Sequence, residues 1–167
     1  MVTALLADRA GARFKAHRSG SDVAEGRLAD VPVTLARPRS YMNLSGKPVA
    51  AVTAFYKVPP GRLVVIHDEL DIGFGTLRLK LGGGDNGHNG LRSISAALGT
   101  RDYYRVRFGI GRPPGRMDPA AYVLHDFSAA ERKDLPFFID RAADATEALI
   151  AQGLGEAQNT YHEELPG

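Results

Sequence analysis

The apolar positions along the chain alternate between helical and strand spacing. Residues 1–14 carry a helical stripe of four apolar side chains, Val2, Leu5, Leu6 and Ala10. Residues 31–36 have the composition of a strand. A second helix is predicted to start at Lys47-Pro48 and to end before Pro59-Pro60, because proline suits the first turn of a helix and stops one elsewhere.

Three strands are predicted in the middle of the chain. Residues 62–66 are a largely apolar run, typical of a strand that is buried on both faces. Residues 76–81 and 104–110 alternate apolar and basic side chains, which predicts two strands with one face in water. A helix is predicted between these two strands, because Leu91, Ile94 and Leu98 share one face and Gly99 follows them.

The last part of the sequence predicts a closing helix. Ser128 and Glu131 fit a capping box at its start. Its apolar stripe consists of Ile139, Ala142, Ala143, Thr146, Leu149 and Ile150. Gly153 is then expected to end the helix.

This order of elements predicts an α/β fold with a mixed central sheet flanked by helices. A chain of 167 residues with 44% hydrophobic content suits one core, so a single domain is predicted over residues 1–167. The sequence opens inside a helix, whereas an α/β sheet normally opens with a strand that feeds its first helix. We therefore expect the first strand of the sheet to be missing in front.

Composition excludes several classes of protein. The chain has no cysteine, which rules out disulfides and thiolate metal sites. No stretch approaches the roughly 20 apolar residues of a membrane span, and the start lacks the order of a secretory signal, so a cytoplasmic location is expected. The acidic segment at 67–71 lacks the spacing of a calcium-binding loop, so a metal site is disfavoured.

Positive charge is concentrated in the middle of the chain. Residues 76–117 carry eight basic and two acidic side chains, whereas residues 118–167 carry three and ten. A polyanion such as RNA suits the middle segment. The alternative is that these side chains only solvate the outer faces of strands.

A glycine-rich loop at 80–90 lies inside this basic segment. It contains five glycines, two asparagines and His88, so its backbone can approach a ligand closely while its side chains donate and accept hydrogen bonds. The alternative is an ordinary turn.

Two further segments carry candidate chemistry. Asp68 follows the predicted strand at 62–66 and is suited to orient a histidine, although a solvated acidic turn is the alternative. Asn43 precedes a helix, where it either caps that helix or holds a carbonyl or a water molecule, and Tyr41 offers a ring for stacking. Ser40 and Ser45 lack the glycine-flanked turn of serine hydrolases, which disfavours nucleophilic catalysis.

Together these segments resemble the bacterial peptidyl-tRNA hydrolase family. The matching segments are Tyr-Met-Asn-Leu-Ser-Gly-Lys at 41–47, His-Asp-Glu-Leu-Asp at 67–71, Lys-Leu-Gly-Gly-Gly at 80–84 with His-Asn-Gly-Leu at 88–91, and Arg-Phe-Gly-Ile-Gly-Arg-Pro at 107–113. Residues 14–17 and 112–121 are similar to actinobacterial members. The resemblance implies hydrolysis of the ester that joins a peptide to the 3′ end of tRNA, without a cofactor and by a monomer.

The resemblance also implies roles for individual residues at the peptide end of the substrate. Asn43 and Asn89 would hold the peptide backbone, the CCA end and the attacking water. Tyr41 and Met42 would line that site, and His88 would support it.

The remaining implied roles concern the general base and the tRNA backbone. Asp68 would orient the general-base histidine, and Lys80 with Arg107 would clamp a tRNA phosphate. In the family the base histidine belongs to a Thr-Arg-His-Asn segment near the N-terminus, and this segment is absent from the sequence.

Three hypotheses therefore remain open. The first is a peptidyl-tRNA hydrolase whose front segment lies upstream or was lost. The second is a non-catalytic tRNA- or RNA-binding relative of the same fold. The third is an unrelated domain that binds a small ligand, for which ligand binding would be insensitive to salt, unlike tRNA binding.

Overall fold

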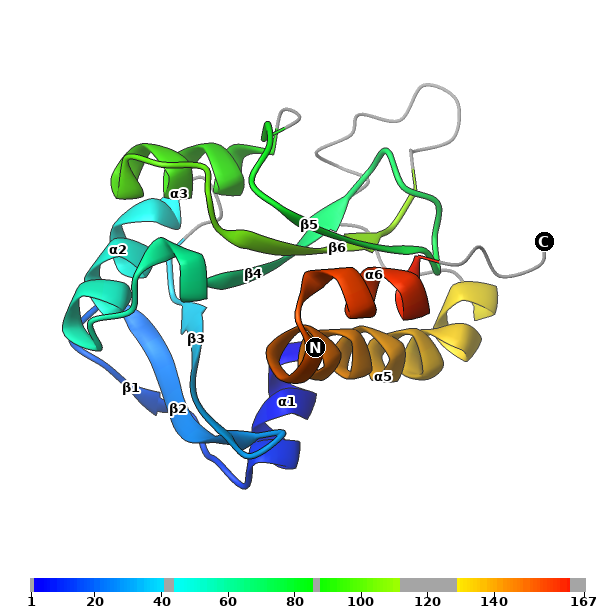
Figure 1. Cartoon of the computed structure of the whole chain (residues 1–167), viewed down its shortest axis with the longest axis horizontal. Coiled ribbons are helices and arrows are strands. Elements are labelled where there is room, and N and C mark those ends of the chain that lie inside the picture. The colour runs from blue at the N-terminus through cyan, green and yellow to red at the C-terminus, as the bar shows by residue number, and fades with distance from the viewer. Residues whose placement is uncertain (1, 41–43, 86–87, 112–128, 163–167) are drawn as a thin grey trace. The chain divides into compact units, whose positions relative to one another are not determined.

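The computed structural model describes residues 2–40, 44–85, 88–111 and 129–162 (Figure 1). Helices and strands alternate over these residues, which confirms the predicted α/β class. In chain order the elements are α1 (Val2–Ala10), β1 (Lys15–Ala16), β2 (Ser21–Leu28), β3 (Val31–Pro38), α2 (Gly46–Phe55), η2 (Pro60–Arg62), β4 (Val64–Glu69), β5 (Leu77–Leu81), α3 (Asn89–Leu98), β6 (Tyr104–Gly109), α5 (Ala129–Gln152) and α6 (Leu154–Tyr161).

The chain forms two compact units. The first contains Thr3–Val65 and Lys80–Tyr104, and the second contains Ile66–Leu79 and Arg105–Gly167. The strands form two three-stranded sheets, of order β1-β2-β3 and β4-β6-β5. A single domain over residues 1–167 stays a prediction.

The first unit contains an antiparallel sheet that the hydrophobic pattern revealed only in part. Strand β3 was predicted, but β1 and β2 were not. Strands β2 and β3 pair from Ser21 opposite Pro38 to Leu28 opposite Val31. Ala29 and Asp30 turn the chain between them with φ angles of 50° and 63°. Two such residues make the tight turn that favours hairpins, but Ala-Asp lacks the Asn-Gly signature by which such turns are found.

Helices α2 and α3 pack side by side in this unit (Figure 1). Their shared core contains Val49, Leu91, Ile94 and Tyr103, all buried. Gly99 follows α3 with a φ of 72°, the left-handed conformation that ends a helix, as its position predicted. The two helices and their bounds agree with the hydrophobic pattern.

The second sheet corrects two expectations. Strand β4 extends through His67 and Asp68 to Glu69, so the acidic segment begins inside the strand rather than after it. The wet-face assignment for Arg105 was wrong, because this side chain is completely buried. Strand β6 lies between β4 and β5, and a central strand can be covered on both faces, so alternating apolar and basic residues did not mark a solvated face here.

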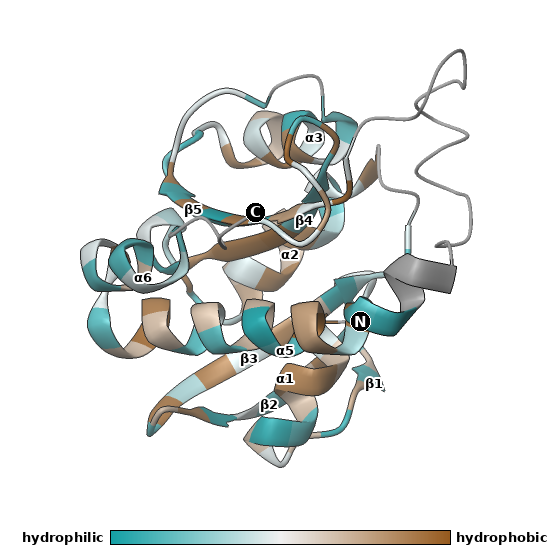
Figure 2. Ribbon diagram, turned by 90° about the vertical axis from the view of Figure 1, so that its right-hand side faces the viewer, coloured by the Kyte–Doolittle hydropathy of each residue, from teal (hydrophilic) through white to brown (hydrophobic). Residues whose placement is uncertain are grey.

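The C-terminal part is helical, as predicted, but it contains one more helix. Figure 2 shows hydrophobic and hydrophilic residues alternating along α5. Ala142 and Ala143 of this helix are fully buried. Phe138 stacks on Phe108 with ring centroids 3.9 Å apart. Gly153 ends α5 with a φ of 87°, and the unpredicted α6 starts immediately after it. Ser128 lies outside the described residues, so the capping box stays a prediction.

No helix in the described part of the chain combines the length and the apolar character needed to span a membrane.

Candidate functional site

The structure describes five of the eight residues predicted for the site. Tyr41, Met42 and Asn43 lie outside the described residues. Lys80, His88 and Asn89 belong to the first unit, whereas Asp68 and Arg107 belong to the second. The roles of all eight stay predictions.

His88 and Asn89 form the start of helix α3. His88 is the N-cap residue, and its Nδ1 accepts a hydrogen bond from the Leu91 backbone N–H at 3.1 Å. An accepting Nδ1 places the proton of the neutral ring on Nε2. Asn89 is the first residue of the helix and is exposed. His88 therefore has a structural task, holding the turn that presents the Asn89 carboxamide.

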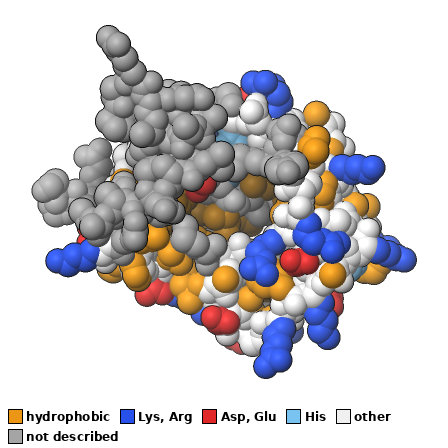
Figure 3. Space-filling view, turned by 180° about the vertical axis from the view of Figure 1, so that it is seen from behind, with side chains coloured by type: hydrophobic (Ala, Val, Ile, Leu, Met, Phe, Trp, Pro, Cys, Tyr) orange, Lys and Arg blue, Asp and Glu red, His pale blue; other side chains and the backbone are white. Residues whose placement is uncertain are grey.

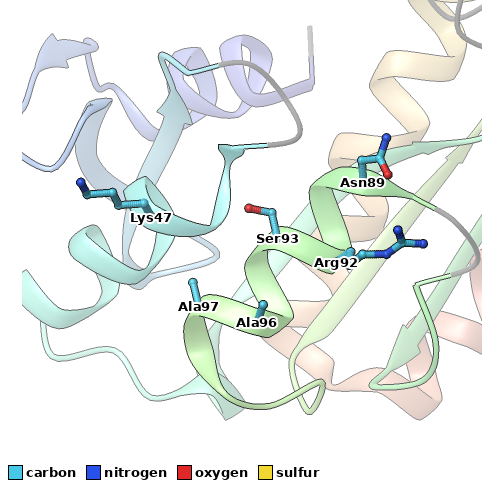
Figure 4. A pocket seen from close by; sticks show the side chains of 6 residues that line it. All are labelled: Lys47, Asn89, Arg92, Ser93, Ala96 and Ala97. Atoms are coloured by element: carbon cyan, nitrogen blue, oxygen red, sulfur yellow. The ribbon is translucent and has the colours of Figure 1, made fainter.

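Asn89 lines a shallow groove of about 630 Å³ on α2 and α3, here called the α3 groove (Figure 4). The groove is lined by Lys47, Asn89, Arg92, Ser93, Ala96 and Ala97. It combines two cationic side chains with a carboxamide, and the small alanines leave the groove open. Such a set suits a phosphate beside an uncharged polar group.

Close contact between α2 and α3 shapes this groove. The Gly46 backbone N–H donates to Ser93 Oγ at 2.8 Å. A Cβ atom at Gly46 would lie 2.0 Å from the Ser93 carbonyl oxygen, so only glycine permits this approach. Gly46 of the segment at 41–47 thus has a structural role that the sequence analysis did not assign.

Lys80 lies on β5, where its ammonium group approaches the glycine-rich loop. A Cβ atom at Gly83 would lie 2.9 Å from Lys80 Nζ, and Gly83 has a φ of 97°. Any other residue at this position would strain the backbone and displace the lysine head. At least one glycine of the loop therefore makes room for a cation.

Arg107 lies in a cluster that sequence reasoning missed, the Glu69 cluster of His67, Glu69 and Arg107. Arg107 Nε donates to Glu69 Oε1 at 3.1 Å, and the Glu69 side chain is only 5% exposed. His67 Nδ1 lies 3.8 Å from the same oxygen. The Nδ1 also contacts the Asp68 carbonyl oxygen at 3.2 Å, which requires a proton on Nδ1 because a carbonyl only accepts. The carboxylate thus fixes the guanidinium of a predicted phosphate ligand.

A second missed residue is His162, at the end of α6. Its Nε2 accepts a hydrogen bond from the Leu79 backbone N–H, and Gln158 donates to the Leu79 carbonyl oxygen at 2.9 Å. Burial lowers the pKa of His162, and the positive charges of Arg78 and Arg107 lower it further. The side chains of His162 and Gln158 thus provide hydrogen-bond partners for both backbone groups of Leu79 in β5. Only the polar composition of residues 158–162 hinted at this role.

Comparisons with known proteins agree over nearly the whole chain. The family model described as peptidyl-tRNA hydrolase matches residues 1–166. Curated peptidyl-tRNA hydrolases from Frankia alni, Mycolicibacterium smegmatis and Streptomyces coelicolor are 67%, 61% and 61% identical. Each match covers 97% of this chain and 82%, 85% and 84% of the respective relative.

A solved structure supports the same assignment. The crystal structure of peptidyl-tRNA hydrolase from Acinetobacter baumannii matches with a TM-score of 0.90 at 33% identity, covering 99% of this chain and 85% of that chain. Sequence and fold therefore agree with the resemblance drawn from the four segments. The chain belongs to the peptidyl-tRNA hydrolase family.

Proposed function

We propose that this protein hydrolyses the ester bond of peptidyl-tRNA and releases free tRNA and a peptide. The observation that carries the proposal is the match of the peptidyl-tRNA hydrolase model to residues 1–166, joined by 67% identity to a curated hydrolase. The substrate would be a tRNA whose aminoacyl group is N-blocked. We expect the protein to act as a cytoplasmic monomer.

The chemistry requires an activated water and donors for the developing oxyanion. The exposed carboxamide of Asn89 is a suitable donor, because the first turn of α3 and the His88 cap hold its backbone in place. Asn43 is proposed as the second amide, with Tyr41 and Met42 beside the peptide. Lys47 and Arg92 would attract the phosphates that precede the ester.

Two further cations are proposed as ligands of tRNA phosphates. Arg107 is oriented by Glu69 at 3.1 Å, so its guanidinium loses little conformational freedom on binding. Lys80 is positioned against Gly83. Each is supported by geometry within its own unit.

The general base is assigned by the resemblance alone. The resemblance gives that role to a histidine of the Thr-Arg-His-Asn segment, with Asp68 orienting it. We propose that the 167-residue chain binds tRNA but hydrolyses the ester slowly, since general-base catalysis contributes about 10²–10⁴-fold.

The test compares two proteins on an N-acetylated aminoacyl-tRNA. One is the 167-residue chain, and the other is the same chain preceded by the front segment of the Frankia alni relative. We expect turnover by the extended protein and a rate about 10²–10⁴-fold lower for the chain alone. Equal rates would place the base within residues 1–167, with His88 the first candidate.

The same experiment separates the second candidate function. Binding of tRNA without turnover by either protein would indicate a non-catalytic RNA-binding relative. The basic segment at 76–117 suits either function, because both require binding of tRNA and differ only in turnover. Absence of both binding and turnover would overturn the proposed function.

A further inference from the structure

A second concentration of positive charge lies in the first unit, apart from the basic segment at 76–117. Residues 13–57 carry eight basic and three acidic side chains. Acidic residues at 8 and 68–71, on either side of this stretch, offset its positive charge in a count over the N-terminal part of the chain. Figure 3 shows lysine and arginine side chains along the right-hand side of the molecule, with hydrophobic side chains between them. All eight are exposed: Arg13, Lys15, Arg18, Arg27, Arg37, Arg39, Lys47 and Lys57.

Two of these arginines lie over aromatic rings. The Arg18 guanidinium is 4.6 Å from the centroid of Phe55, and the Arg37 guanidinium is 3.7 Å from that of Phe14. A guanidinium that stacks on a ring keeps its N–H groups around its edge, where they can reach phosphate oxygens. Ring stacking therefore orders two exposed cations that would otherwise sample many rotamers.

The ring beneath Arg18 belongs to an aromatic cluster at the end of α2. His17 and Tyr56 both contact Phe55, with centroid distances of 4.6 Å and 4.9 Å. His17 and Tyr56 are 5.8 Å apart. Phe55 itself is 45% exposed, among the larger exposed fractions for an apolar side chain in the described part of the chain. An exposed ring among ordered polar rings is a platform on which a flat ligand can stack.

The loop that carries His17 is held in place by hydrogen bonds. The Ser19 backbone N–H donates to His17 Nδ1 at 3.1 Å, and Arg39 Nη2 donates to the His17 carbonyl oxygen at 2.7 Å. Arg39 also lies 3.7 Å from Asp22. These contacts hold His17 and Arg39 in place before any ligand arrives, which lowers the entropy lost on binding.

We propose that this basic-aromatic face, formed by His17, Arg18, Arg39, Phe55, Tyr56 and Lys57, binds a single-stranded RNA segment. Unpaired bases stack on aromatic side chains and on guanidinium planes, while the backbone phosphates take the positive charges. An acidic peptide would satisfy the charges but leave Phe55 exposed, and a duplex would hide its bases. The face is distinct from the proposed ester-hydrolysis residues, so the proposal goes beyond that function.

Helix α2 connects this face to the α3 groove within the first unit. Lys47 lies in the first turn of α2 and Phe55 is its last residue, so they are about 12 Å apart along the helix axis. The RNA on the face is either a loop of the tRNA substrate or part of another RNA. Both sources present the same chemistry, and the test below distinguishes them.

The test measures fluorescence anisotropy of a labelled oligouridylate of about 12 nucleotides, a length within the usual range for single-strand sites. The variants are Phe55→Leu, which removes the ring, and Arg18→Gln, which removes the stacked charge. Their controls are Phe137→Leu, at a side chain that is 65% exposed on α5, and Arg62→Gln, at an exposed arginine of η2. All four positions are exposed, so the variants are expected to fold.

We expect Phe55→Leu to weaken binding about 5- to 20-fold, in the range found for loss of one stacked base. Arg18→Gln should weaken binding and lower the slope of log affinity against log salt by about 0.7. The two controls should change affinity less than twofold. If Phe55→Leu weakens the binding of intact tRNA by the same factor, the face binds a loop of the tRNA substrate. If it weakens only the binding of the oligonucleotide, the face binds another RNA.

Three results would overturn the proposal. They are equal binding of a blunt RNA duplex of the same length, equal affinity of Phe55→Leu and Phe137→Leu, and displacement of the RNA by polyglutamate at matched charge. None of these results depends on turnover, so they test RNA binding by this face independently of the proposed hydrolase activity.

Discussion

The α3 groove and the Glu69 cluster use positive charge in opposite ways. Lys47 is exposed in the groove, and the Arg92 side chain is 65% exposed and only loosely paired with Asp85 at 3.8 Å. Arg107 is 17% exposed and bound to a carboxylate that is 5% exposed. Exposed charges cost little and contribute little stability, whereas a buried charge that loses its partner is expensive. The charged side chains of the α3 groove can therefore move to bind a ligand at little cost in stability, whereas the Glu69 cluster contributes to the stability of the fold.

The largest expected effect comes from removing the buried carboxylate. Glu69→Leu should lower the free energy of unfolding by about 3–5 kcal/mol, because it leaves Arg107, whose side chain is only 17% exposed, without its partner at 3.1 Å. Glu69→Gln, which keeps an acceptor oxygen, should cost less. Urea denaturation measures both. A loss below about 0.5 kcal/mol for Glu69→Leu, the range of surface substitutions, would remove the contrast between the two regions.

Gly46→Ala tests how tightly the groove is built. The added Cβ would lie 2.0 Å from the Ser93 carbonyl oxygen, so α2 and α3 must separate, at a cost of about 1–3 kcal/mol. Gly155→Ala is the matched control, since it is also a helical glycine and has no atom within 4 Å of the added Cβ. The control should stabilise α6 slightly, by up to about 1 kcal/mol. Equal melting temperatures for the two variants would disprove the close contact.

His88 separates capping from catalysis. His88→Ala should cost about 0.5–2 kcal/mol, because the Leu91 N–H loses its acceptor at 3.1 Å, and His88→Asn should restore most of it. The informative readout is hydrolysis by the front-extended protein. If His88→Asn recovers stability and keeps the rate, the residue is a helix cap. A rate loss in a stable His88→Asn protein would instead give its ring a chemical role.

The smallest effect is a pH dependence from His162. Its pKa is lowered in the folded state by burial first and then by Arg78 and Arg107, so the unfolded chain binds the proton more readily. Stability from this group is present above the ordinary pKa of about 6.5 and is lost as pH falls through the lower folded value. We expect His162→Gln to flatten the fall in unfolding free energy below about pH 6.5, the ordinary pKa of a histidine side chain. Parallel curves for the two proteins would contradict this assignment.

Regular spacing made most helices predictable from the sequence. Helices α2, α3 and α5 were found from apolar stripes, and the ends of α3 and α5 were found from Gly99 and Gly153, which both have a positive φ. The β2–β3 hairpin was missed because Ala29 and Asp30 adopt a turn that their residue types rarely signal. Helix α6 was missed because its first residues, Leu154 and Gly155, follow a glycine that looked like the end of the fold.

The predicted site depended on motifs more than on spacing. Motifs pointed to Asp68 and Arg107 but gave no reason to choose the neighbouring Glu69, because burial decides which carboxylate in an acidic run acquires a partner. The same limit applies to Arg105, which is completely buried. Basic and apolar residues alternate in the same way along a strand with one face in water and along a strand that is covered on both faces. Exposure is a property of the assembled sheet and not of the local pattern.

The two hydrogen bonds between α6 and Leu79 must form late when the chain folds during its synthesis. Gln158 and His162 follow their partner by 79 and 83 residues, so the backbone of β5 acquires these bonds only after that much more of the chain has been synthesised. Until α6 has been synthesised, the backbone groups of Leu79 must therefore form hydrogen bonds with water or with a chaperone. A chain that ends before Gln158 leaves the backbone of Leu79 without the two side chains that cover it, so this edge of β5 stays exposed until α6 is in place.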